Sequence, residues 1–349
     1  MKQFKVTIAN SGKTFIVREG ENILMAALRQ GVMLPYSCKN GTCGSCKGAV
    51  KSGEVHYPFH PPMALDKSDY AEGLALLCQA EPIEDLVIQV REIEAVRDIQ
   101  VRMMPARVME KEFLSKNVVR LVLRLPKAQR LQFLAGQYVD VLLSGGKRRA
   151  FSIASCPSLE DEIELHIRHV DGGDFTGFVF NDLKEREILR LEGPQGNFFV
   201  RNDQPERPMI MMGGGTGFAP LKSMIENLIE QGDRREIHLY WGARDREDLY
   251  LDDLPCRWAK EKDNIHYRRA LSEAAAGKGP GAHLGLVHEA VLVDHPDLSG
   301  FDVYMSGPPA MIEAAKTAFS QQGVDENRLF YDSFEFGLDV PVRVLARPH

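Results

Sequence analysis

Four of the six cysteines have the spacing of an iron–sulfur ligand set. Cys38, Cys43 and Cys46 lie within nine residues, and Cys78 follows 32 positions after Cys46. A C-x4-C-x2-C run with one distant cysteine is the plant-type pattern for a 2Fe-2S cluster. Thiolates this close together can hold two irons only if the backbone curls tightly around them. We therefore predict that these cysteines are the ligands of a 2Fe-2S cluster.

Two glycines favour this prediction over its alternatives. Gly41 and Gly44 permit the curl, because glycine accepts a positive φ and lets backbone N–H groups approach the sulfurs. The alternatives are a structural zinc site and buried free thiols. Zinc sites usually pair two C-x2-C knuckles, whereas here a triplet accompanies a single cysteine. Cys156 and Cys256 belong to no cluster, so we expect them to be small packed thiols.

A second set of candidate residues lies between positions 149 and 176. Arg149 and Phe151, taken alone, are a surface charge and a strand residue. Glycines at 172 and 173 precede Thr176, which we expect to cap a short helix. A helix N-terminus flanked by glycines is an anion site suited to a pyrophosphate.

A third set consists of two strand-to-helix turns. Residues 213–217 read Gly-Gly-Gly-Thr-Gly after an apolar strand and open a helix, and residues 306–309 read Ser-Gly-Pro-Pro after a later strand. Backbone N–H groups and the helix dipole at such a turn can hold a diphosphate. Two such turns in one parallel sheet line a common crevice, so we predict a dinucleotide site.

Together, these motifs resemble the ferredoxin-NADP⁺ reductase superfamily, in the group whose members carry an N-terminal plant-type ferredoxin domain. The group contains reductase components of oxygenases and the CDP-6-deoxy-glucoseen reductases, and the resemblance covers essentially the whole chain. It implies that Arg149 binds the FAD phosphates, that Phe151 covers the flavin face and that Ser152 faces the flavin N5. Phe151 stands where the family has tyrosine, and Ser306 where it has cysteine. Phe334 is expected to face the flavin, with Phe336 as the second candidate.

The resemblance thus implies a complete set of site residues. Ser152 and Ser306 are assigned to catalysis, and Cys38, Cys43, Cys46 and Cys78 to the metal. The cofactor-binding residues are Arg149, Ala150, Phe151, Ser152, His166, Ile167, Arg168, Gly173, Phe175, Thr176, Gly214, Gly215, Thr216, Gly217, Arg244, Ser306, Gly307, Pro308 and Phe334.

The implied reaction takes hydride from NADH to FAD and passes single electrons through the cluster to a partner protein, such as an iron oxygenase or a deoxysugar dehydrase. NADPH use is possible, but Asp245 and Asp248 near Arg244 are expected to repel its 2′-phosphate. His166 and His169 are expected to be positioning or surface residues. The alternatives are a free flavin reductase, which needs no ferredoxin domain, and a non-catalytic ferredoxin-type carrier, which predicts broken nucleotide motifs.

Composition excludes several other classes of protein. The 349 residues carry 43 basic and 49 acidic side chains, a net charge of −6, and show no basic cluster for nucleic acid. The longest uncharged stretch, Pro208 to Leu221, is too short to span a bilayer and contains three glycines. With no signal sequence in view, we expect a cytoplasmic protein without membrane insertion.

Periodicity predicts three domains, at 1–93, 103–203 and 204–349, with a linker between Glu92 and Pro105. The resemblance implies a β-grasp ferredoxin domain for the first. The second is predicted to be an antiparallel β-barrel, with strands at 118–125, 138–143 and 163–170 and a helix at 178–183.

The third domain is predicted to be a parallel α/β sheet. Its strands are expected at 209–212, 237–241, 265–270, 303–305 and 329–331, and its helices at 221–230, 286–293 and 310–321. In the first domain we expect a hairpin of residues 4–8 and 14–17 and a helix over 21–30.

Overall fold

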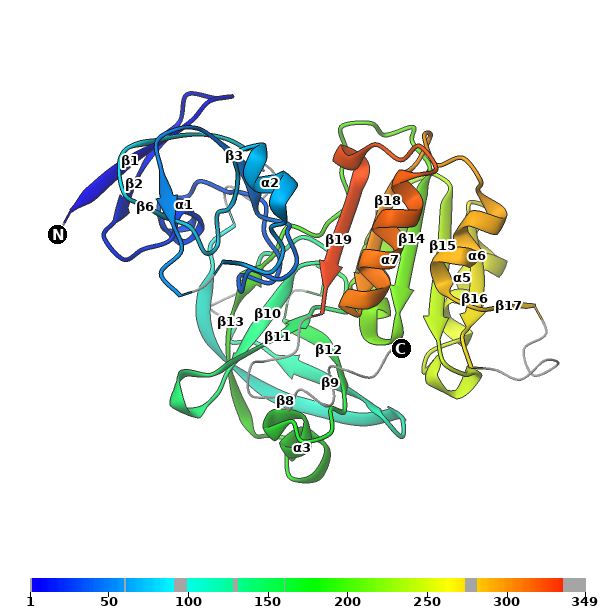
Figure 1. The fold of residues 1–349 in the computed structure, drawn as a ribbon. Coiled ribbons are helices and arrows are strands. Elements are labelled where there is room, and N and C mark those ends of the chain that lie inside the picture. Colours follow the sequence, from blue (N-terminus) through cyan, green and yellow to red (C-terminus); the bar gives the residue numbers. More distant parts are fainter. Residues whose placement is uncertain are drawn as a thin grey trace. The chain divides into compact units, whose positions relative to one another are not determined.

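The computed structural model describes residues 2–59, 61–90, 99–127, 131–159, 161–273 and 281–334. The chain divides into two compact units, Met1–Gln100 and Val101–His349 (Figure 1). The first half of the predicted linker, residues 92–98, lies outside the described residues. Strand β8 begins at Arg102, inside the segment expected as linker, because Arg102–Pro105 pair with β13.

The first unit is built on a five-stranded sheet in the order β2-β1-β7-β3-β5. The predicted hairpin is confirmed, since β1 and β2 pair antiparallel. Helix α1 begins two residues later than predicted, because the Asn22 side chain accepts a hydrogen bond from the Met25 N–H and caps it there. The elements are β1 (Gln3–Ile8), β2 (Thr14–Arg18), α1 (Ile23–Arg29), β3 (Lys47–Ser52), β4 (Val55–His56), α2 (Lys67–Ala71), β5 (Leu74–Leu76), β6 (Glu81–Pro82) and β7 (Leu86–Gln89).

The first part of the second unit is an antiparallel six-stranded sheet in the order β11-β10-β13-β8-β9-β12. Ile153, directly after edge strand β11, forms a bridge with Leu165 on the other edge strand, β12, and this pairing brings the two edges of the sheet together. The alternating side chains of these strands fill one apolar core. The elements are β8 (Arg102–Ser115), β9 (Val118–Arg124), β10 (Tyr138–Leu142), β11 (Arg148–Ser152), β12 (Glu162–Arg168), α3 (Asp174–Asn181) and β13 (Ile188–Gln195).

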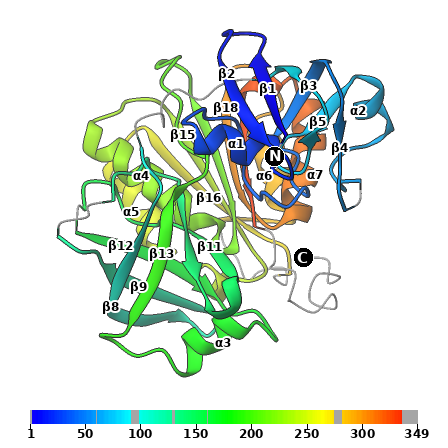
Figure 2. The ribbon, with the colours of Figure 1, turned by 90° about the vertical axis from the view of Figure 1, so that its left-hand side faces the viewer.

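The second part is a six-stranded sheet in the order β17-β16-β15-β14-β18-β19, in which every neighbouring pair is parallel. Helices cover both faces (Figure 2): α4 and α5 pack on one core and α6 and α7 on the other. The elements are β14 (Met209–Gly214), α4 (Phe218–Gln231), β15 (Ile237–Ala243), α5 (Asp253–Glu261), β16 (Ile265–Leu271), β17 (Ala282–Leu284), α6 (Val287–Asp294), β18 (Asp302–Gly307), α7 (Pro309–Ser320) and β19 (Leu329–Ser333).

The strands of this sheet are apolar on both sides, as burial on two faces requires. In β14, Met209 and Met211 contact the α4 side, and Ile210 and Met212 contact the α6 side. None of the helices in the described part of the chain is long and apolar enough to cross a membrane.

Candidate functional site

The four predicted cluster cysteines come together in the first unit. Cys38, Cys43 and Cys46 lie on the loop between α1 and β3, and Cys78 follows β5. Cys38 is partly buried and the other three are buried. Lys39, Gly41 and Gly44 all have positive φ, so the tight curl predicted from the glycines is present.

The sulfurs are arranged in two pairs. The Cys43 thiol donates a hydrogen bond to Cys38, which lowers the pKa of Cys38 to about 5, and the Cys46 thiol donates to Cys78, which lowers the pKa of Cys78 as well. Among the described residues, no group of three or more ligand atoms within 4.8 Å of one another includes a cysteine. A single tetrahedral zinc would need all four sulfurs close together. Two pairs fit a two-iron cluster instead.

Backbone groups support this fit. The N–H of Gly41 is directed at the Cys78 sulfur and the N–H of Cys43 at the Cys38 sulfur, at 3.4 Å. N–H donors to cluster sulfurs tune the reduction potential. The side chain of Gln79 holds the loop, because its amide donates to the Lys39 carbonyl at 3.0 Å. Sequence analysis did not predict this role of Gln79, because its partner Lys39 lies 40 residues earlier in the chain.

The second unit brings the predicted flavin residues onto two strands and a helix. Arg149, Ala150, Phe151 and Ser152 lie on β11, and His166, Ile167 and Arg168 lie on β12. The partly buried Phe151 ring lies 5.5 Å from the ring of Phe175 on α3.

One expectation about this region is wrong. Thr176 does not cap α3, because the helix begins at Asp174, four residues before the predicted start, and its N-cap is Gly173. The Thr176 hydroxyl instead accepts a hydrogen bond from the Val170 N–H at 3.2 Å and lies 3.2 Å from the Val170 carbonyl oxygen. A Cβ on Gly173 would come within 2.7 Å of this hydroxyl oxygen. Thr176 therefore fixes the preceding loop from inside the helix.

The two glycine turns touch each other at the carboxyl edge of the parallel sheet. β14 and β18 are neighbours with Gly213 paired to Ser306. A short 3-10 turn of Gly215, Thr216 and Gly217 follows β14 and leads into α4. A Cβ on Gly217 would lie 2.0 Å from the Ser306 carbonyl oxygen, so only glycine allows this approach.

The buried Ser306 hydroxyl has no hydrogen-bond partner among the described residues. An unsatisfied buried hydroxyl beside two phosphate-binding turns suits a polar ligand group such as a nicotinamide. Gly307 ends β18, and Pro308 precedes α7 as its N-cap. Phe334 follows β19, is partly buried and donates its N–H to the Gly307 carbonyl at 2.9 Å. Phe336 lies outside the described residues.

Arg168 links the flavin strands to the nucleotide turn. A Cβ on Gly215 would lie 2.8 Å from the Arg168 Nη1. Burial lowers the pKa of Arg168, the carboxylate of Asp248 raises it, and the charge of Arg244 lowers it further. A largely buried guanidinium with another cation nearby favours an anion between them.

A buried polar network, which sequence reasoning missed, fastens the antiparallel sheet to the parallel one. The His166 ring lies 3.0 Å from the Tyr250 hydroxyl through Nδ1 and 2.6 Å from the Glu164 carboxylate through Nε2. Lys222 on α4 lies 3.5 Å from Glu164 and donates to the Ala154 carbonyl. Glu164 is a local partner on the same strand, but Tyr250 lies 84 residues from His166 in the chain, so the sequence pattern around His166 does not indicate the contact that joins the two sheets.

The network carries defined charges. Burial alone would raise the pKa of Glu164, but the hydrogen bond from His166 and the charge of Lys222 hold it at about 2. Burial lowers the pKa of His166 and raises that of Tyr250. The buried His166 ring is thus held between the Glu164 carboxylate and the Tyr250 hydroxyl.

Comparison with known proteins finds three family matches along the chain. Residues 6–82 match the 2Fe-2S iron-sulfur cluster binding domain, residues 105–200 the oxidoreductase FAD-binding domain, and residues 211–317 the oxidoreductase NAD-binding domain. These three domains define a flavin- and iron–sulfur-containing reductase.

Relatives agree over the full length. The CDP-6-deoxy-L-threo-D-glycero-4-hexulose-3-dehydrase reductase of Yersinia pestis is 42% identical over 94% of this chain and 98% of its own. The reductase component of phenol 2-monooxygenase from Pseudomonas sp. is 39% identical over 96% of both chains. The solved Amycolatopsis reductase GcoB is 33% identical, with a TM-score of 0.77 over 95% of this chain and 98% of its own.

The chain therefore belongs to the ferredoxin-NADP⁺ reductase superfamily, in the group with an N-terminal plant-type 2Fe-2S domain. It is an NAD(P)H-dependent oxidoreductase with FAD and a 2Fe-2S cluster, and it transfers electrons to a partner protein.

Proposed function

We propose that this reductase prefers NADH and supplies single electrons to an iron-containing dehydrase acting on a sugar nucleotide. The location of the hydride-transfer site rests on one observation. Three segments of the second unit meet there: the Gly215–Gly217 turn, the Ser306 turn and Arg168 of β12. When bound, FAD accepts two electrons as hydride and releases them singly, which a relay from NADH to a cluster requires.

The residues at this junction have separate proposed roles. The Gly214–Gly217 backbone and Arg244 hold the nicotinamide nucleotide, and the Ser306 hydroxyl, which needs a partner, orients the nicotinamide. Arg149 and the Thr176 loop bind the FAD phosphates, Phe151 and Phe334 cover the flavin, and Ser152 faces its N5.

The proposed domain limits are 1–93, 103–203 and 204–349. Their proposed fold classes are β-grasp, antiparallel barrel and parallel α/β sheet. The five-stranded sheet around α1 supports the first, and the bridge between Ile153 and Leu165 supports the second.

The NADH preference rests on the acidic turn after β15. Asp245, the neighbour of Arg244 in the chain, caps this turn: its carboxylate accepts hydrogen bonds from the N–H groups of Glu247 and Asp248 and is thereby fixed in the turn. Asp248 adds a second negative charge, which already acts on Arg168. A 2′-phosphate dianion at Arg244 would meet both carboxylates, whereas a bare ribose would not.

Steady-state kinetics test this preference. NADH should give the larger kcat/KM, and Asp248→Asn should raise the value for NADPH several-fold while changing that for NADH less. Glu247→Gln is the matched control, because its side chain is 84% exposed in the same turn and should alter neither value. A tenfold preference of the unaltered protein for NADPH would refute the proposal.

The partner class rests on the relatives. The dehydrase reductase is the first candidate by identity, 42% against 39%, and the oxygenase reductase component is the second. With NADH, the purified protein should support turnover of a CDP-6-deoxy-hexulose dehydrase at least tenfold faster than hydroxylation by a phenol monooxygenase. The reverse order would assign the protein to an oxygenase. In either assay, Cys43→Ser should abolish turnover but leave NADH-dependent ferricyanide reduction within a few-fold.

A further inference from the structure

A group of metal-ligating side chains lies at the amino edge of the parallel sheet. Glu236, His238 and His266 stand where β15 and β16 begin, at Ile237 and Ile265. The glycine turns follow the carboxyl ends of β14 and β18 in the same sheet. Because the strands are parallel, the group and the turns lie at opposite edges. None of the roles proposed above uses these three residues.

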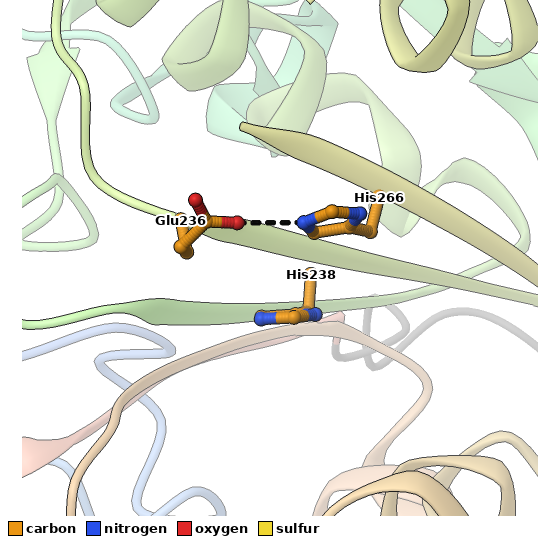
Figure 3. A group of neighbouring side chains, drawn as sticks. All are labelled: Glu236, His238 and His266. Carbon is orange, nitrogen blue, oxygen red and sulfur yellow. Dashed lines mark hydrogen bonds and ion pairs between the residues drawn. The ribbon is translucent and has the colours of Figure 1, made fainter. Parts of the chain in front are cut away.

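Strand geometry explains why the three side chains converge. Glu236 directly precedes β15 and His238 is the second residue of that strand, so the two are two positions apart along the chain, the spacing at which extended residues share a face of the sheet. His266 is the register partner of His238 on the neighbouring parallel strand. One ligand atom from each residue lies within 4.8 Å of the others, and this is the only such group in the part of the chain that the structure describes (Figure 3).

Packing holds His238 in place, whereas the side chains of Glu236 and His266 can adjust. The His238 ring is packed between the ring of His266, at 4.8 Å, and the ring of His295 at the end of α6, at 4.5 Å. Glu236 and His266 are about half exposed (side chains 51% and 50%), and the Glu236 Oε2 lies 2.6 Å from the His266 Nε2. Exposed side chains can rotate at little cost, whereas a packed ring gives the site a fixed point.

The distances suit a small first-row ion. Zinc bonds nitrogen and carboxylate oxygen at about 2.0–2.2 Å, which places tetrahedral ligand atoms roughly 3.4 Å apart. The Glu236 and His266 ligand atoms, 2.6 Å apart, must separate by about 0.8 Å to reach this spacing, whereas a pair near the 4.8 Å limit must approach. Rotation of the two half-exposed side chains allows both movements. A surface ion pair would explain the contact between Glu236 and His266. It would not explain why a second imidazole, that of His238, stacks on the ring of His266.

We propose that Glu236, His238 and His266 form a three-ligand site for a divalent transition-metal ion, Zn²⁺ in preference to Mg²⁺ or Ca²⁺, with the fourth position open to water. Two imidazoles and one carboxylate are a zinc donor set, and imidazole nitrogen is a poor ligand for the harder ions. The ion joins the starts of β15 and β16, so it binds the folded sheet more tightly than the unfolded chain and stabilises it.

Direct binding tests the site in the complete protein with FAD and cluster present. After removal of loosely bound metal by a chelator, Zn²⁺ is titrated calorimetrically, and zinc and iron are counted by mass spectrometry. We expect one Zn²⁺ per chain in addition to the cluster iron, with unchanged iron content. Zn²⁺, but not Mg²⁺, should raise the melting temperature.

Variants separate this site from adventitious binding. His266→Gln and Glu236→Gln change half-exposed side chains, so they should fold, and each should weaken Zn²⁺ binding by roughly tenfold or more. His238→Asn should do the same and serves as a third variant. His288→Gln, on α6 outside the group, is the matched control and should bind as the unaltered protein does. Equal Zn²⁺ binding by His266→Gln and the unaltered protein, or no binding below millimolar Zn²⁺, would overturn the proposal.

Discussion

The contact between the two glycine turns allows one prediction to be worked in detail. Gly217 has φ −58° and ψ −14°, ordinary values for alanine, so Gly217→Ala causes no backbone strain of its own. The added methyl group would lie 2.0 Å from the Ser306 carbonyl oxygen and 2.5 Å from its carbon. The obstacle is backbone, which cannot rotate away as a side chain can.

The size of the effect follows from this distance. Because Cβ contacts under 3.0 Å essentially never occur, the turns after β14 and β18 must separate by about 1 Å. Forcing a methyl group into a packed site costs about 1–3 kcal/mol of stability. Moving the two walls of a hydride site apart by about 1 Å can slow the reaction about 100-fold. We therefore expect flavin reduction by NADH to slow about 10- to 100-fold in Gly217→Ala.

Anaerobic stopped-flow measurement of flavin bleaching provides the assay. FAD and iron content and the melting temperature are measured on the same samples, so that misfolding is recognised. Gly300→Ala is the matched control, because it adds the same methyl group in the turn that precedes β18, with nothing within 4 Å. If Gly217→Ala reduces its flavin within twofold of both Gly300→Ala and the unaltered protein, the turns do not form the hydride site as reasoned here.

Three further predictions concern the two units and the buried network. Deleting residues 1–93 should leave NADH-dependent ferricyanide reduction within a few-fold while cluster-dependent reduction of the partner falls to background; a partner still reduced at the full rate would make the flavin the exit site. Tyr250→Phe leaves the buried His166 Nδ1 without its 3.0 Å partner, so it should lower the free energy of unfolding by about 1–2 kcal/mol, whereas Tyr70→Phe, at 46% exposure, should change it little; equal losses in the two variants would refute this. The pKa of Glu164 is about 2 in the folded protein against 4.5 ordinarily, so the unfolded chain binds more protons between these values and stability falls as the pH drops through this window, by on the order of 3 kcal/mol. Acid unfolding is followed by the fluorescence of the two tryptophans, and Glu164→Gln should lose less stability than the unaltered protein as the pH falls. Identical acid profiles of the two proteins would contradict the low pKa assigned to Glu164.

The sequence by itself determined the features that depend on neighbouring residues. The spacing of Cys38, Cys43 and Cys46 allowed the cluster loop to be predicted, because three ligands on nine residues constrain the backbone locally. The glycine turn at 213–217 was predictable for the same reason, as were the strands with a clear alternation. The start of α3 was missed because Gly173, which caps it, carries no side-chain signal.

The tertiary structure decided whatever depends on contacts between distant segments. It alone put Gly217 against Ser306, His166 against Tyr250, and His238 beside His266 on the next strand. Residue types show which groups could interact, but the register of neighbouring strands and the packing of helices on them set which groups meet. These choices are made by the whole apolar core, whose energy no short segment encodes.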